Sequence, residues 1–73
     1  MSLNIDTLSQ GQKVKYLDIN GTDYQRSTYE DLGINTNDTY TIKRWHIDNW
    51  FTAIYLEEFG YQMFNSVCFV EAN

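Results

Sequence analysis

Closely spaced turn signals constrain the fold of this 73-residue chain more than any other feature. Asn20-Gly21 is the strongest, because both residue types tolerate positive φ. The stretch from Asn35 to Asp38, the pair Asp48-Asn49 and the pair Phe59-Gly60 mark further turns. The segments between them are rich in aromatic and β-branched residues, and the chain has no proline. The sequence therefore predicts a mostly β fold of five or six short antiparallel strands.

The alternation of apolar and polar residues places these strands. Neither face of the segment 39–47 is apolar throughout, so we expect a bulge near Lys43-Arg44. Asn65-Ser66 is typical of a short 3₁₀ step before the last strand. The expected strands are residues 12–19, 22–25, 39–47, 50–57, 61–64 and 67–71.

One helical turn is expected in the long connection after the first strands. Ser27-Thr28-Tyr29-Glu30 matches the capping box, in which a hydroxyl and a carboxylate satisfy amide groups at a helix start. Gly33 follows where a helix would close. The sequence therefore predicts a helical turn near residues 27–32.

The order of these elements favours a small SH3-like barrel. A long loop follows the first strand, then three hairpin-linked strands, then a 3₁₀ step into the final strand. Closure into a barrel removes the exposed edges that so small a sheet could not otherwise protect. An α+β fold is the alternative, although only the turn near 27–32 could supply its helix. We expect one domain over residues 1–73, with 1–10 as a loosely ordered lead-in whose Leu3, Ile5 and Leu8 cover one barrel edge.

Four segments resemble a known group of proteins: Val14-Lys15-Tyr16, Asp38-Thr39-Tyr40-Thr41-Ile42, Tyr55-Leu56-Glu57-Glu58 and Phe64-Asn65-Ser66-Val67. Over about residues 12–72 the chain is similar to short SH3-like barrel proteins encoded by uncharacterised reading frames of bacterial phages and prophages. The resemblance implies the fold and an origin in a mobile element. It carries over no functional residue, because the segments are signatures of strands and turns.

The apolar positions of the strands predict the core. Cys68 lies in an apolar segment, where a cysteine usually behaves as a small buried hydrophobe. A lone cysteine forms no internal disulfide and fits a reducing, cytoplasmic setting. The expected core consists of Val14, Ile42, Trp50, Ile54, Leu56, Phe64, Val67 and Phe69.

The charge balance narrows the range of partners. Ten acidic and five basic residues give a net charge of −5, which argues against nucleic acids and anionic membranes as partners. No apolar run approaches the roughly 18 residues of a membrane span, and we expect no signal peptide. A basic protein partner, or acidic mimicry of a nucleic acid, fits the charge.

The chain has few of the residues that catalytic and metal sites require. A single histidine, His46, and a single cysteine, Cys68, cannot supply the roughly four ligands of a zinc site. They are also the only possible thiol–imidazole pair, and the cysteine is expected to be buried. Each glycine stands alone at a turn, so no phosphate-binding loop exists. We expect no enzyme activity, no metal and no cofactor.

The chain has more aromatic residues than a small barrel can bury: six Tyr, four Phe and two Trp. We expect Trp45, Tyr55 and Tyr61 to lie on one exposed patch as rigid contact area, with His46 beside them as a further binding residue. The alternative is that the surplus rings cover the barrel ends.

Two functions from different classes follow. The first is a small acidic, non-enzymatic protein-interaction module that docks on an unidentified protein or pairs with itself. The second is a small-ligand or nucleotide-binding, sequestering protein, in which stacked rings and Lys43-Arg44 hold a base and a phosphate.

Overall fold

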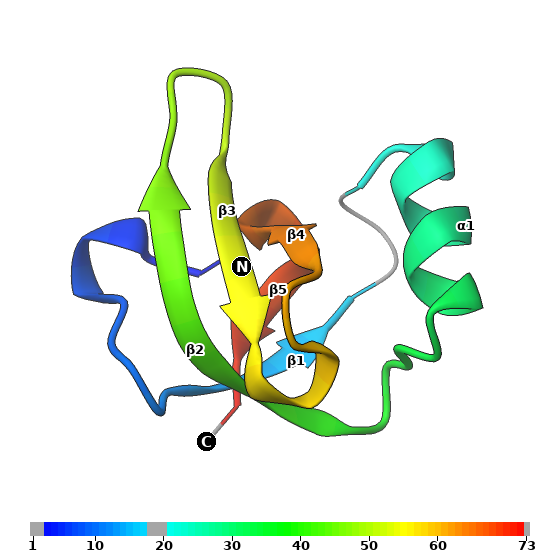
Figure 1. Cartoon of the computed structure of the whole chain (residues 1–73), viewed down its shortest axis with the longest axis horizontal. Coiled ribbons are helices and arrows are strands. Elements are labelled where there is room, and N and C mark those ends of the chain that lie inside the picture. Colours follow the sequence, from blue (N-terminus) through cyan, green and yellow to red (C-terminus); the bar gives the residue numbers. More distant parts are fainter. Residues whose placement is uncertain (1–2, 18–20, 73) are drawn as a thin grey trace.

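Five short strands and one α-helix form the fold (Figure 1). The computed structural model describes residues 3–17 and 21–72. The α-helix is α1 (Asp23–Asp31), and three turns of 3₁₀ helix are η1 (Ile5–Thr7), η2 (Glu57–Phe59) and η3 (Ser66–Cys68). The strands are β1 (Lys13–Tyr16), β2 (Thr39–Ile47), β3 (Thr52–Leu56), β4 (Met63–Asn65) and β5 (Phe69–Glu71).

The strands pair antiparallel in the order β4-β3-β2-β1-β5. The predicted mostly β fold is therefore confirmed, as is the 3₁₀ step before the last strand. β4 and β5 stand at the two ends of this order, and within the described chain no strand ladder joins them. They are linked by η3 and by packing of Phe64 against Phe69, whose ring centroids are 5.8 Å apart.

β2 contains the predicted bulge. Ile42 pairs with Leu56 and Arg44 pairs with Tyr55, so Lys43 is an extra residue that faces no partner on β3. Such an insertion bends the strand and re-aims the side chains that follow it. β2 can therefore pair with β1 over its first residues and with β3 over the remainder.

The β2–β3 hairpin projects beyond the rest of the sheet (Figure 1). Its turn is wider than the predicted Asp48-Asn49 pair, because the Asp48 amide donates to the carbonyl oxygen of Phe51 at 3.1 Å. Trp50 consequently lies in the turn and not in β3. The expectation that Trp50 belongs to the core is wrong, since 91% of this residue is exposed.

The segment after β1 leads into a helix, which corrects two expectations. β1 is shorter than residues 12–19, and residues 22–25 form the start of α1 and not a return strand. Asn20 of the predicted Asn20-Gly21 turn lies outside the described residues. At Gly21, a Cβ would approach the Cys68 sulfur, so close packing favours glycine at this position.

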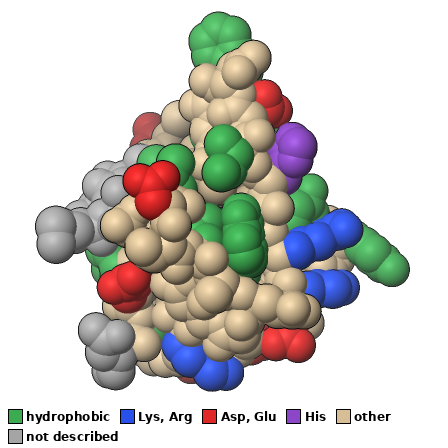
Figure 2. Space-filling model, turned by 90° about the vertical axis from the view of Figure 1, so that its left-hand side faces the viewer, with side chains coloured by type: hydrophobic (Ala, Val, Ile, Leu, Met, Phe, Trp, Pro, Cys, Tyr) green, Lys and Arg blue, Asp and Glu red, His purple; other side chains and the backbone are tan. Residues whose placement is uncertain are grey.

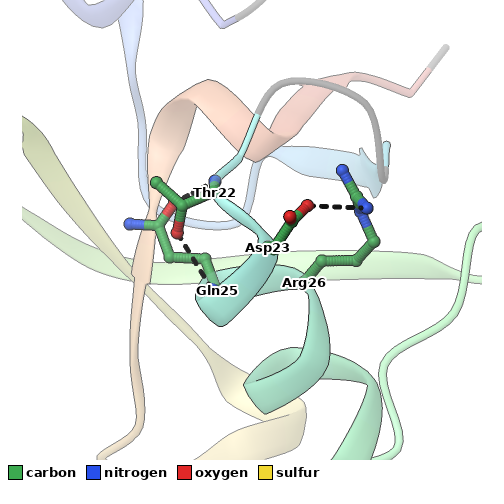
Figure 3. A network of polar contacts seen from close by, with 4 residues as sticks. All are labelled: Thr22, Asp23, Gln25 and Arg26. Carbon is green, nitrogen blue, oxygen red and sulfur yellow. Dashed lines mark hydrogen bonds and ion pairs between the residues drawn. The ribbon is translucent and has the colours of Figure 1, made fainter.

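α1 begins one turn earlier than predicted. The Gln25 amide donates to the Thr22 hydroxyl at 3.1 Å, and the Thr22 amide donates to the Gln25 side-chain oxygen at 3.1 Å (Figure 3). The capping box is therefore formed by Thr22 and Gln25, and not by Ser27 and Glu30. Asp23 in the first turn favours the helix start and also pairs with Arg26 at 3.2 Å.

The predicted helix end at Gly33 is confirmed. Gly33 has a φ of 98°, and its amide donates to the Glu30 carbonyl. The Ile34 amide donates to the Tyr29 carbonyl, which completes a Schellman motif. Ile34 and Tyr29 are both buried, so the end of α1 is tied to the core.

The core is more aromatic than predicted. Six of the eight expected residues are completely buried, but Trp50 and Val67 are exposed. Val67 lies in η3 and not in a strand, and there its neighbours Ser66 and Cys68 are the residues that point inward. The aliphatic and aromatic members of the core cluster that the strand pattern did not place in the core are Leu3, Leu8, Tyr16, Tyr29, Ile34 and Tyr40.

Candidate functional site

The residues predicted to bind a partner do not share one side of β2: strand pairing places Tyr55 and His46 on one side and Trp45 on the other. Tyr55 pairs with Arg44, and His46 lies two residues further along β2 on the same side as Arg44. Trp45 pairs with Ile54 and therefore projects from the opposite, core-facing side. Tyr61, in the turn before β4, is 84% exposed. The structure thus divides the expected single patch, because side chains alternate along a strand.

Two cations of β2 lie over tyrosine rings. The Arg44 guanidinium carbon is 4.4 Å from the centre of the Tyr55 ring, and the Lys43 Nζ is 5.0 Å from the centre of the Tyr61 ring. A cation within about 6 Å of an aromatic face is attracted by the ring quadrupole. These contacts hold the two cations in place while their N–H groups remain available at the surface.

A hollow of about 470 Å³ borders this pair of cations. We call it the cationic hollow, and it is lined by Gln10, Lys43, Arg44 and Trp45. It lies at the edge of β2 that does not face β3. Along this edge β1 pairs with Thr39 to Thr41, and residues 11 and 12 form backbone hydrogen bonds with Ile42; beyond Ile42 no strand of the described chain pairs with this edge. Because the hollow lies at this free edge of β2, side chains from both faces of the strand line it: Arg44 from one face and the Trp45 indole from the other, with Lys43 and Gln10 beside them.

A second concave surface lies at the base and tip of the hairpin. It has a volume of about 370 Å³, and we call it the hairpin groove. Its exposed apolar residues are Ile5, Ile47, Trp50 and Val67. Asp48 and Asn49 add polar groups to its lining. Residues from η1, the hairpin and η3 therefore meet in one apolar surface with a partly polar margin.

Figure 2 shows one face of the molecule with its side chains coloured by type. A hydrophobic side chain stands at the tip of the hairpin, and further hydrophobic side chains continue below it. Two cationic side chains lie close together at the right of this view, near the purple histidine. Acidic side chains are scattered around the rest of the face.

The thiol and the imidazole lie in different environments. Cys68 is 1% exposed, and burial raises the pKa of its thiol above the ordinary value. The sulfur is therefore protonated at neutral pH, which is the unreactive form of a thiol. His46 is exposed on β2. The thiol is therefore buried whereas the imidazole is exposed to solvent.

Within residues 3–17 and 21–72, no group of three or more His, Cys, Asp or Glu side chains is placed to hold a metal ion. The helices in this part of the chain include none with the length and apolar character needed to cross a membrane.

Sequence patterns missed the residues of the hairpin groove. Strand alternation predicts that Trp50 and Val67 face inward, whereas both are exposed. Aspartate is favoured at the first position of a four-residue turn. Asp48 is therefore a sequence signal for a turn from Asp48 to Phe51, which would place Trp50 in the turn and not in a strand. Ile5 and Ile47 carried no local signal, because their exposure depends on how η1 and the hairpin are placed.

Comparison of the chain with protein-family models, with curated proteins and with solved structures finds no significant match.

Proposed function

We propose that this chain is a small acidic, non-enzymatic interaction module that binds another protein, or a second copy of itself, through the hairpin groove. The single observation that carries the proposal is Trp50, a tryptophan that is 91% exposed at the tip of a projecting hairpin. Tryptophan is among the residues most enriched at the energetic centres of protein interfaces.

The surroundings of Trp50 support the same function. Ile47 is 59% exposed, although it lies on a strand whose other end is buried. Burial of a large apolar side chain is worth about 1.5–3 kcal/mol. A partner that covers Trp50 and Ile47 therefore gains stabilisation that the isolated chain does not obtain.

The groove also has the layout of an interface. Apolar residues from three separate elements line it, and Asp48 and Asn49 provide polar groups beside them. Interfaces commonly combine an apolar centre with a polar rim, which limits non-specific association. The net charge of −5 favours a partner with a basic contact surface.

The first experiment measures solution mass by size-exclusion chromatography with light scattering over a range of concentrations. The variants are Trp50→Ala and, as a control, Tyr24→Ala, which removes another highly exposed ring, from α1. If the chain pairs with itself, Trp50→Ala weakens the pairing by about 2 kcal/mol or more, whereas Tyr24→Ala does not change it.

If the chain is monomeric, the same three proteins serve as baits. A foreign protein retained by the wild type and by Tyr24→Ala, but lost from Trp50→Ala, supports the proposal. A strictly monomeric chain with no partner that depends on Trp50 contradicts it.

A further inference from the structure

We infer that the cationic hollow binds a nucleoside phosphate, that is, a ligand with a planar ring and an anionic group. The hollow and the hairpin groove share no lining residue. The inference therefore goes beyond the proposed protein interaction, and either one can fail without the other.

The first support is the placement of two adjacent cations. In a regular strand, neighbouring side chains point to opposite sides. The bulge at Lys43 breaks this alternation, and both Lys43 and Arg44 lie over tyrosine rings that border the β2–β3 sheet. Because the rings already restrain the two side chains, less conformational entropy is lost when a phosphate binds them.

The second support is that these charges are not neutralised by the protein. Within residues 3–17 and 21–72, neither Lys43 nor Arg44 has a carboxylate oxygen within 4.0 Å. The acidic net charge of the chain opposes anion binding at long range, but the screening length is about 8 Å at physiological ionic strength. Local charge therefore dominates at the hollow, and charge-assisted hydrogen bonds from arginine to phosphate are among the stronger polar contacts.

The third support is a ring and an amide beside the cations. Trp45 is 36% exposed, which leaves part of its indole available for stacking. Base–aromatic stacking contributes about 1–3 kcal/mol per base. The Gln10 side chain has no hydrogen-bond partner in the described part of the chain, so its donor and acceptor are free for a base edge. The hollow has a volume of about 470 Å³ and is open to solvent.

The test uses ¹⁵N–¹H NMR titrations of the full chain with ATP, adenosine and inorganic pyrophosphate as separate probes. We expect ATP to shift the amide signals of residues 10 and 43–45 and the indole signal of Trp45. Pyrophosphate lacks the stacking ring, so its affinity should be about 5- to 150-fold lower than that of ATP. Adenosine lacks the phosphates and should also bind more weakly. High salt should weaken ATP binding.

Two variants with matched charge test the location of the site. Arg44→Gln removes a cation of the hollow and should weaken ATP binding about tenfold or more. Lys15→Gln removes the same charge from an exposed position on β1 and should leave the affinity unchanged. Trp50→Ala should also leave it unchanged, because Trp50 belongs to the hairpin groove.

Three results would overturn the inference. The first is an absence of shifts at residues 43–45 with millimolar ATP at low salt. The second is an equal loss of affinity in Arg44→Gln and Lys15→Gln, which indicates attraction to net charge alone. The third is binding of pyrophosphate as tight as that of ATP, which excludes a role for the Trp45 ring.

Discussion

The hydroxyl oxygen of Tyr29 accepts a hydrogen bond from the backbone amide of Asn65, with 3.0 Å between oxygen and nitrogen. This contact joins α1 to β4 across 36 positions of sequence. The Tyr29 ring also packs edge-on against Phe64, with 4.8 Å between ring centres. Tyr29 therefore links the helix to the edge strand through both a polar and an apolar contact.

Substitution of Tyr29 by Phe keeps the ring and removes the hydroxyl. We expect the free energy of unfolding to fall by about 1–2 kcal/mol, because the partly buried Asn65 amide loses its acceptor. Urea denaturation of the variant measures the loss. Tyr24→Phe is the control, since Tyr24 is exposed on the same helix and should be neutral. Equal stability of the two variants would show that the hydrogen bond contributes little.

Gly21 packs against Cys68 so closely that a side chain does not fit. A Cβ at position 21 would lie 2.7 Å from the Cys68 sulfur. We expect Gly21→Ala to cost about 1–3 kcal/mol through overpacking. In a double-mutant cycle, Cys68→Ala should reduce the cost of Gly21→Ala, because it removes the clashing atom. Additive effects of the two substitutions would mean that the sulfur is not the obstacle.

The start of α1 can be tested with two single substitutions. Thr22→Ala removes the hydroxyl that caps Gln25 and should destabilise the protein by about 1 kcal/mol. Ser27→Ala changes an exposed residue inside the helix and should have little effect. Thermal unfolding followed by circular dichroism compares them. A larger loss of stability from Ser27→Ala than from Thr22→Ala would indicate that Ser27 and Glu30, and not Thr22 and Gln25, form the capping box.

Stability should fall at alkaline pH because burial raises the pKa of the Cys68 thiol above its ordinary 9.0. The folded state then binds the thiol proton more tightly than the unfolded state. The contribution of this protonated thiol to the free energy of unfolding is complete below about pH 9, and it is lost as the pH rises through the folded-state pKa. Urea denaturation from about pH 8 to about pH 10 should show this fall, and Cys68→Ala should show a smaller one. The Tyr29 pKa is also raised, mainly by burial, so some of the fall remains in the variant.

Elements with local signals were predictable from the sequence. β2 was placed at its observed bounds, and the bulge near Lys43 followed from a change of apolar face within the strand. Gly33 marked the end of α1 because the left-handed conformation there favours glycine. The start of α1 was not predicted because two capping patterns follow one another, at Thr22–Gln25 and at Ser27–Glu30, and the helix uses the first.

The candidate surfaces were predictable only in part. The Lys43-Arg44 pair and Trp45 were recognised as possible ligand contacts, but Gln10 was not, because nothing local links it to β2. Trp50 was assigned to the core by alternation. The hairpin turn includes this residue, so alternation does not apply to it.

The sequence by itself determined the strand-rich character of the chain, the bulge near Lys43, the helix end at Gly33, the burial of Cys68 and the surplus of aromatic rings, because each depends on residue type and near neighbours. Only the tertiary structure decided which rings are exposed and which charges meet. Those outcomes depend on strand register and on contacts between distant segments, such as that of Tyr29 with Asn65. A shift of one residue at the bulge or at the hairpin turn moves every following side chain of the strand to the opposite face of the sheet. Amino-acid composition does not determine that register.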